Sequence, residues 1–287
     1  MKTRFAVAQF SMSPVYEENI AKADRYAEEA AKKGASLLLL PELFEGPYFC
    51  QIEDYRNFAL AEERERSKTI AHFQKKAKEL HLVMPVSFFE KDGPTYFNSI
   101  AIINSDGDVL GYYRKSHIPT GACYEEKFYF APGDTGFEVF DTAAGKIGVG
   151  ICWDQWFPEA ARIMALQGAQ ILFYPSAIGS EPVLPRDSKL HWQNTMRGHA
   201  AANLIPLMAC NRVGVEKAGD SSMQFFGSSF AADSHGEMVG ELSREEEGVL
   251  TADFDLAASD QERVDWGVFR DRRVDLYGAL LKQGSGK

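Results

Sequence analysis

The sequence predicts an α/β fold, because strand-like and helix-like segments alternate along its 287 residues. The run SLLLLP at 36–41 is almost wholly apolar, as expected for a strand that is covered on both faces. The order strand, helix, strand, helix and hairpin also occurs twice, once in each half of the chain. These observations indicate two stacked sheets or one large sheet, with the helices outside.

The first half begins with a predicted strand over 5–10 and an amphipathic helix over 18–33. Gly34 follows this helix, where glycine is the residue that most often terminates a helix. After the apolar strand we expect a helix, a strand and a hairpin, over 67–80, 82–90 and 98–115. The turn residues SDGD at 105–108 join the two arms of this hairpin.

The second half contains the same kinds of segment. Its predicted strands are 137–142, 146–152, 170–176, 205–214 and 248–256, and its predicted helices are 158–169 and 187–203. A second hairpin is expected over 228–242, and Asp187 or Ser188 is the predicted N-cap of the second helix. No linker or change in composition separates the halves, so we expect a single domain over 1–287.

The composition argues against several classes of partner. The net charge is −10, whereas nucleic acids and anionic membranes favour a basic surface. No apolar run approaches the ~18 residues of a membrane span, and the first residues resemble a strand more than a secretory signal. The four cysteines lie far apart without a CxxC pair, which predicts neither a disulfide framework nor a zinc site. We therefore expect a protein of the reducing cytoplasm.

Four reactive side chains follow a common pattern, since each comes shortly after an apolar strand. They are Glu42, Lys115, Glu126 and Cys152. Folds of the α/β class usually place their functional side chains at such strand ends. Glu42 directly follows four leucines and a proline, where a carboxylate needs a partner if it is buried.

Cys152 ends an apolar run in the segment GICWDQWFPEAAR. It could fill the core, form half of a disulfide, bind a metal or act as a nucleophile, and a buried structural role is the commonest for cysteine. A nucleophilic cysteine needs a base or a cationic neighbour. Glu42 could take the thiol proton. Lys115 and the backbone N–H of Trp153 could then stabilise the oxyanion of a tetrahedral intermediate.

Other catalytic motifs do not occur. The chain has no GxSxG, Walker or HExxH sequence, and GVG at 148–150 lacks the third glycine of a dinucleotide loop. His117 offers a Cys–His alternative, but no local signature surrounds it, and we interpret it as structural. Cys123 is likewise expected to have a surface or packing role.

Three motifs in this order resemble the nitrilase superfamily of carbon–nitrogen hydrolases. They are LLLLPELF, YRKSHIP with EKFYFAPGDTGF, and GICWDQWFPEAAR. The resemblance extends from AVAQF to the C-terminal tail. Within the superfamily, PELFEGPYFCQ, CWDQWFPEAAR, ILFYPSAIGSEP, HWQNTMRGHAAAN and WGVFRDRR are most similar to the N-carbamoylputrescine amidohydrolases.

This resemblance implies a four-layer α-β-β-α sandwich with two sheets face to face. It implies Cys152 as the nucleophile, Glu42 as the general base, Lys115 as the oxyanion-stabilising lysine and Glu126 as the glutamate that orients the lysine. It implies no metal and no organic cofactor. It further implies a homodimer or larger homo-oligomer, with the tail of about 257–287 in the contacts.

The implied reaction is hydrolysis of N-carbamoylputrescine to putrescine, CO₂ and ammonia, through a carbamoyl thioester, in polyamine biosynthesis. The alternative is a related hydrolase that acts on another N-carbamoyl amine, a β-ureido acid or an ω-amide. A substrate that ends in a carboxylate would need an arginine, and Arg186 and Arg212 are the arginines to examine. A substrate that ends in an amine would need an acidic residue.

The residues expected to bind the substrate surround these motifs. Aromatic side chains suit a methylene chain and can face an ammonium group. The expected substrate-binding residues are Tyr48, Trp153, Asp154, Trp156, Ser176, Ala177 and Glu181. Asp154 and Glu181 are the candidate carboxylates for an amine, although Asp154 could instead cap the helix at 158–169. Relatives usually read HIPD where this chain has Thr120, which removes one acidic residue.

Overall fold

Two sheets form the centre of the computed structural model, which describes residues 2–180 and 186–284. In the first sheet β1 pairs with β15 and β2, and β3, β4 and β5 form an antiparallel meander. Their bounds are β1 Thr3–Gln9, β2 Leu37–Leu39, β3 Met84–Asp92, β4 Thr95–Ile103, β5 Val109–Arg114 and β15 Gly248–Phe254. A bridge between Leu37 and Val83 joins the two groups of strands into one layer.

The second sheet has six strands in the order β14-β13-β10-β8-β7-β6. Its strands are β6 Val139–Thr142, β7 Gly145–Val149, β8 Ile171–Pro175, β10 Leu207–Cys210, β13 Phe230–Ala232 and β14 Met238–Glu241. The central strands β7, β8 and β10 run parallel to one another. Their carboxyl ends therefore meet at one edge of the sheet, where loops can gather functional side chains.

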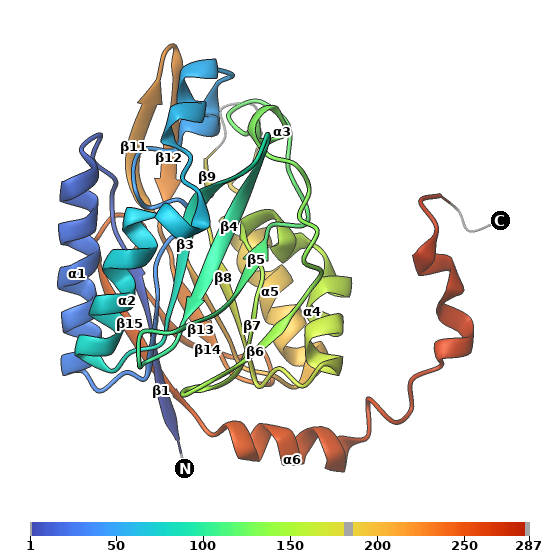
Figure 1. Ribbon diagram of the computed structural model, residues 1–287. Coiled ribbons are helices and arrows are strands. Elements are labelled where there is room, and N and C mark those ends of the chain that lie inside the picture. The colour runs from blue at the N-terminus through green and yellow to red at the C-terminus, as the bar shows by residue number, and fades with distance from the viewer. Residues whose placement is uncertain (1, 181–185, 285–287) are drawn as a thin grey trace.

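The two sheets pack face to face, with helices on the outer face of each (Figure 1). Helices α1 (Tyr16–Lys32) and α2 (Lys68–Leu80) cover the first sheet, and α4 (Pro158–Leu166) and α5 (Lys189–Asn203) cover the second. Apolar side chains of both sheets form the central core, including Phe5, Leu39, Val149, Phe173 and Met208. This four-layer α-β-β-α sandwich confirms the expected architecture and decides in favour of two stacked sheets.

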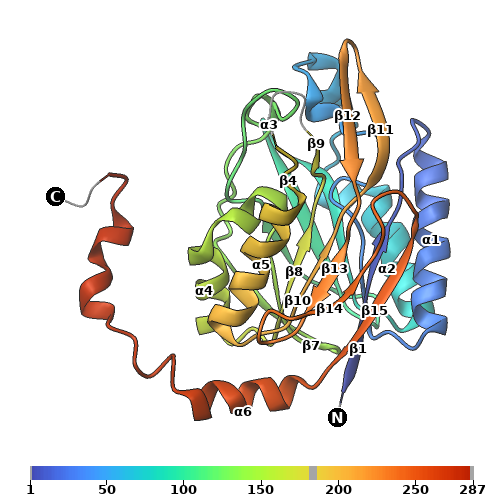
Figure 2. The same ribbon diagram turned by 180° about the vertical axis from the view of Figure 1, so that it is seen from behind.

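One predicted strand is wrong in its length. The segment 205–214 divides into β10 and β11 (Val213–Ala218), because the chain turns at Asn211 and Arg212. The Asn211 side chain bonds both backbone groups of Ile178, which stabilises the turn. Strand β11 then forms a hairpin with β12 (Ser221–Phe226), and β9 (Gly179–Ser180) pairs beside it. Figure 2 shows this small sheet at one end of the sandwich.

The remaining elements are short or lie outside the sandwich. They are α3 Glu126–Tyr129, α6 Leu256–Trp266, and the 3-10 segments η1 Phe49–Gln51, η2 Tyr55–Leu60, η3 Arg64–Arg66, η4 Cys152–Trp156 and η5 Val274–Leu281. Helix α6 lies along the lower edge of the sandwich, where Asp260, Glu262 and Arg263 bond residues of the second sheet and its loops, and the tail after it extends away (Figures 1 and 2). Within residues 2–180 and 186–284, no helix has the length and apolarity to cross a membrane.

Candidate active site

The four reactive side chains of the common pattern come together at one end of the sandwich. Glu42 and Lys115 follow β2 and β5, and Glu126 and Cys152 are the first residues of α3 and η4. Each of these residues is at most 4% exposed, so their charges act on one another with little screening by water. The structure therefore brings all four into one buried cluster, as expected.

Lys115 is the centre of this cluster. Its ammonium Nζ lies 2.8 Å from Glu42 Oε1, and 2.9 and 2.7 Å from the two carboxylate oxygens of Glu126. Burial by itself lowers the pKa of Lys115, but the charges of Glu126 and Glu42 outweigh it and raise that pKa well above its ordinary value. Lys115 is thus held as a cation at neutral pH.

Glu42 has one occupied and one unoccupied carboxylate oxygen. Its Oε1 accepts from Lys115 and from the side-chain amide of Asn98 at 2.6 Å. Its Oε2 is buried and has no hydrogen-bond partner within the described residues. A buried carboxylate oxygen without a partner can accept a hydrogen bond or a proton from a group that comes next to it. Asn98 was not predicted, since nothing in the strand sequence NSIAIIN distinguishes it from a turn residue.

Tyr48 lies behind the cluster and not in the cavity wall where we expected it. Its hydroxyl donates to Glu126 Oε1 at 2.6 Å, and the residue is fully buried. Burial raises the pKa of Glu126 to about 7, although Lys115 acts in the opposite direction. Tyr48 therefore contacts the cluster through Glu126, and it does not line the cavity beside Cys152.

The backbone at Cys152 has a conformation that a side chain rarely adopts. Its φ is +43°, which costs about 1–2 kcal/mol for a residue other than glycine. Gly150 makes the sharp turn possible, because a Cβ there would lie 2.8 Å from the Tyr174 ring and 3.2 Å from Asp154 Cβ. The turn directs the sulfur toward the buried cluster, whose charges act on it.

The thiol of Cys152 is held in its neutral form at rest. Burial and the negative charge of Glu42 raise its pKa well above the ordinary value, and Lys115 opposes this shift only in part. A backbone hydrogen bond from Ala177 also favours the thiolate. Ala177, which the sequence analysis expected to bind the substrate, thus contacts the Cys152 sulfur through its backbone. Attack by Cys152 requires removal of its proton to a neighbouring base.

Asp154 is not available as a carboxylate for a substrate amine. Its Oδ2 accepts from the Tyr113 hydroxyl at 2.7 Å and the Ile151 N–H at 2.9 Å. Its Oδ1 accepts from the backbone N–H of His117 at 3.0 Å and lies 2.7 Å from the His117 ring nitrogen Nδ1. The alternative, a cap of helix 158–169, is also wrong, because Phe157 occupies the cap position. Asp154 instead ties the Cys152 turn to the segment that carries Lys115.

A cavity of about 240 Å³ opens beside Cys152. It is lined by Pro119, Tyr124, Cys152, Trp153, Gln155, Trp156, Ile178, Ser188 and His191. Trp153 and Trp156 form part of its wall, as the sequence predicted. Among the described residues this lining includes no aspartate, glutamate or arginine, and its polar side chains include Gln155, Ser188 and His191.

The other residues named for the substrate tail do not line this cavity. Arg212 is fully buried and both of its terminal nitrogens are hydrogen-bonded, Arg186 is exposed, and Thr120 is exposed at the edge of the adjoining loop. Ser176 is buried and donates to Gln155 Oε1 at 2.9 Å. Glu181 lies outside the described residues.

Gln155 was missed by the sequence analysis, although it lies beside Cys152 in the chain. Its Oε1 accepts from Ser176 and from Trp192 Nε1, and its backbone oxygen lies 2.8 Å from His199 Nε2. Because Trp192 Nε1 can only donate, the Gln155 amide nitrogen must occupy the other position, where it has no partner within the described residues. Gln155 therefore joins the Cys152 turn to α5.

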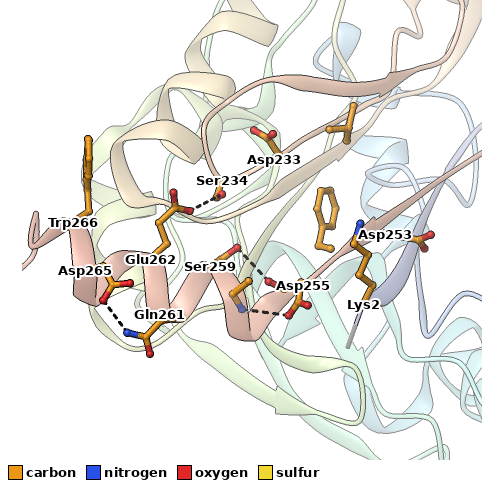
Figure 3. Close-up of a pocket in the computed structure, with 13 residues that line it drawn as sticks. Lys2, Asp233, Ser234, Asp253, Asp255, Ser259, Gln261, Glu262, Asp265 and Trp266 are labelled. Atoms are coloured by element: carbon orange, nitrogen blue, oxygen red, sulfur yellow. Dashed lines mark hydrogen bonds between the residues drawn. The ribbon is translucent and has the colours of Figure 1, made fainter.

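A second, larger cavity of about 670 Å³ lies at the base of α6 (Figure 3). Acidic residues such as Asp233, Asp253 and Glu262 line it, together with Lys2 and Trp266. None of the four clustered side chains reaches it, and its lining contains no cysteine or histidine. Nor do the described residues hold any group of three His, Cys, Asp or Glu placed to bind a metal. The candidate active site is accordingly the smaller cavity beside Cys152.

We expect Asp154→Ala to lower the free energy of unfolding by about 2–4 kcal/mol, because several buried donors lose their acceptor. Asp154→Asn keeps one carbonyl acceptor and should lose less. Urea denaturation followed by far-UV circular dichroism checks both values. Equal stability of wild type and Asp154→Ala would contradict the anchoring role of this carboxylate.

Comparison with known proteins identifies the family of this chain. The family model described as carbon-nitrogen hydrolase matches residues 4–263. The chain is 54% identical over 285 residues to an N-carbamoylputrescine amidase from Oryza sativa subsp. japonica, with 98% of this chain and 95% of the relative covered. It is 48% identical over 281 residues to a citrullinase from Francisella tularensis subsp. tularensis, with 98% of each chain covered.

The same fold occurs among solved structures. The crystal structure of a carbon-nitrogen hydrolase from Helicobacter pylori G27 superposes with a TM-score of 0.92 at 41% sequence identity, and 99% of each chain is covered. Family model, relatives and structure all extend over nearly the whole chain. The chain therefore belongs to the carbon–nitrogen hydrolase family that its three motifs resemble.

Proposed function

We propose that this chain is an amidohydrolase that converts N-carbamoylputrescine to putrescine, CO₂ and ammonia, a step of polyamine biosynthesis. The observation that carries the proposal is the buried cluster of Glu42, Lys115 and Glu126 at Cys152. The chain that holds this cluster is 54% identical to the N-carbamoylputrescine amidase of Oryza sativa. The cavity beside Cys152 suits the substrate, because aromatic walls fit a methylene chain.

In the first half-reaction the Cys152 sulfur attacks the carbamoyl carbon while its proton passes to the free Oε2 of Glu42. Such a transfer is needed because the resting thiol is neutral. The negative charge on the carbamoyl oxygen is stabilised by Lys115 and the backbone N–H of Trp153. Glu42 then donates its proton to the leaving nitrogen, the C–N bond breaks, and putrescine departs.

In the second half-reaction a carbamoyl thioester on Cys152 is hydrolysed. Glu42 takes a proton from water, and the resulting hydroxide attacks the thioester carbon. When the C–S bond breaks, the proton on Glu42 returns to the sulfur and restores the thiol. The carbamate released decomposes to CO₂ and ammonia. Glu126 keeps Lys115 in place through both halves, since it accepts two of the lysine hydrogen bonds.

Citrulline is a second candidate substrate, and one observation favours it. A relative named citrullinase is 48% identical over 281 residues, and the described cavity wall, which holds neither a carboxylate for an amine nor an arginine for a carboxylate, does not separate the two substrates. Citrulline and N-carbamoylputrescine carry the same ureido group at the reacting end, so one catalytic cluster serves both. Only the tail differs, because citrulline adds an α-carboxylate.

Ammonia release by the purified protein distinguishes these candidates. We expect turnover of N-carbamoylputrescine at a kcat/KM at least about tenfold above that of citrulline, with no turnover of N-carbamoyl-β-alanine. Cys152→Ala serves as the control and should be inactive. Preference for citrulline would retain the mechanism and replace the substrate. Release that persists in Cys152→Ala would reject the mechanism.

The reaction should depend on pH through Glu126. Because the pKa of Glu126 is about 7, a fall in pH below that value protonates it and removes its ion pair with Lys115. We expect kcat/KM to fall as pH drops through about 7, and Glu126→Gln to be slower at all pH values without that limb. A pH profile of both proteins measures this. If Glu126→Gln shows the same fall of kcat/KM near pH 7, the titrating group is not Glu126.

We further propose that the chain forms homo-oligomers in the cytoplasm, with the tail of about 257–287 in the contacts. Support comes from large apolar side chains that α6 and η5 leave exposed, namely Val264, Trp266, Val274, Leu276, Leu280 and Leu281. All four cysteines are free thiols, which suits a reducing compartment. Sedimentation of the full chain should give a dimer or a larger species, and a monomer at micromolar concentration would refute the contacts.

A further inference from the structure

A buried arginine outside the cavity contacts the segment that carries Glu42. Arg212 follows β10 and has no exposed surface. Burial of a charged side chain is costly unless its donors are paired, so the partners of Arg212 identify what it holds. Apart from Glu216, four positions further along the chain, the partners of its guanidinium are backbone oxygens of the first half, about 170 positions away in sequence.

The guanidinium of Arg212 holds the backbone of the turn that follows β2. Its Nη2 donates to the backbone oxygen of Glu42 at 2.6 Å and to that of Leu43 at 2.9 Å. Its Nη1 donates to the backbone oxygen of Gly46 at 3.2 Å. Three carbonyl groups of one turn therefore converge on a single planar group.

Glu216 on β11 completes the arrangement. Its carboxylate oxygens lie 2.9 and 3.1 Å from Arg212 Nη1, which neutralises the buried charge. One of these oxygens also accepts from the backbone N–H of Tyr48 at 2.5 Å. The pair of Arg212 and Glu216 thus bonds the backbone of the turn at both ends, at the Glu42 carbonyl and at the Tyr48 N–H.

Arg212 is itself fixed by the turn between β10 and β11. Its backbone N–H donates to the side chain of Asn211, and its carbonyl accepts from Gly227. Asn211 in turn bonds Ile178 and Gly227. The backbone that carries the guanidinium is therefore held by several hydrogen bonds. The position of the guanidinium in turn defines where the Glu42–Gly46 turn lies.

The held turn requires such support. Leu43 has a φ of +47°, which a leucine rarely adopts, so the turn does not keep this shape by local preference. Glu42 lies directly before Leu43, and Tyr48 carries the hydroxyl that bonds Glu126. A shift of this turn would therefore move Glu42, a direct partner of Lys115, together with Tyr48, which bonds the other partner, Glu126.

We propose that Arg212, paired with Glu216, is a positioning residue that keeps the free oxygen of Glu42 in line with Cys152. This inference rests on the proposed role of Glu42 as the base. An arginine is required because a planar guanidinium reaches several acceptors at once in fixed directions, whereas an ammonium is a single point charge. Catalytic groups lose rate steeply when they are displaced by about 1 Å.

The test uses the full-length chain and Arg212→Lys. This substitution keeps the positive charge but removes the planar guanidinium that bonds several carbonyl groups at once. We expect kcat for the best substrate to fall about 10–100-fold, KM to change less than about threefold, and the acid limb of the pH profile to move. Arg162→Lys is the matched control, because Arg162 also bonds a backbone carbonyl, that of Ala202, far from the site. It should behave as wild type.

Alkylation of Cys152 by iodoacetamide, followed by intact mass, gives a readout independent of the substrate. We expect Arg212→Lys to slow it at least about fivefold, with Cys152→Ala correcting for other thiols. If wild type hydrolyses no ureido substrate while alkylation still depends on Arg212, the proposed function fails and the positioning role stands.

Two results would overturn the inference. A folded Arg212→Lys protein with wild-type kcat, pH profile and alkylation rate would show that the turn keeps its position without the guanidinium of Arg212. If Arg212→Lys does not fold, Glu216→Gln decides by the same measurements, since it keeps an acceptor for Tyr48. Loss of folding in both variants would assign the pair a purely structural role.

Discussion

The ion pair of Lys115 with two buried carboxylates is the constraint on which the site depends. One ammonium group lies between Glu42 and Glu126 with no exposed surface on any of the three side chains. Charges buried in this way are stable only when each is paired and hydrogen-bonded. Removal of Lys115 would leave two carboxylates without a counter-charge in the interior, and removal of either glutamate would take away part of what holds the lysine, so the three groups form a single unit.

That unit needs elements that bring distant parts of the chain to one place. Glu42 and Lys115 follow strands β2 and β5 of the first sheet, whereas Cys152 follows β7 of the second. The face-to-face packing of the sheets closes the distance between them. Asp154 and Arg212 then fix the two turns that carry the nucleophile and the base, each through several hydrogen bonds to backbone groups. Much of the precision of the site thus comes from groups that touch no substrate.

The residues that sequence reasoning placed wrongly share a physical reason. Tyr48, Asp154 and Ser176 lie next to reactive positions in the chain, and their side-chain types suit a binding pocket. Their side chains nevertheless are not part of the cavity lining and bond buried partners. Asn98 and Gln155 were missed as site residues, and Arg212 was considered only for a substrate tail, since the partners of these side chains are far away in sequence. Side-chain direction at a loop depends on which buried groups lack a partner, and that is a tertiary property.

The sequence by itself determined the α/β class, most helices and strands, and the four reactive residues, because apolar periodicity and strand-end position are local patterns. The resemblance of three motifs added the sandwich and the chemistry. Only the tertiary structure decided that two sheets stack, that 205–214 divides at Asn211, and that Asp154 anchors a turn. It also left Glu42, within the described part of the chain, with one oxygen that has no hydrogen-bond partner, in a cluster with a neutral thiol. These outcomes arise from packing and from the pairing of buried charges across the two halves, which no local pattern encodes.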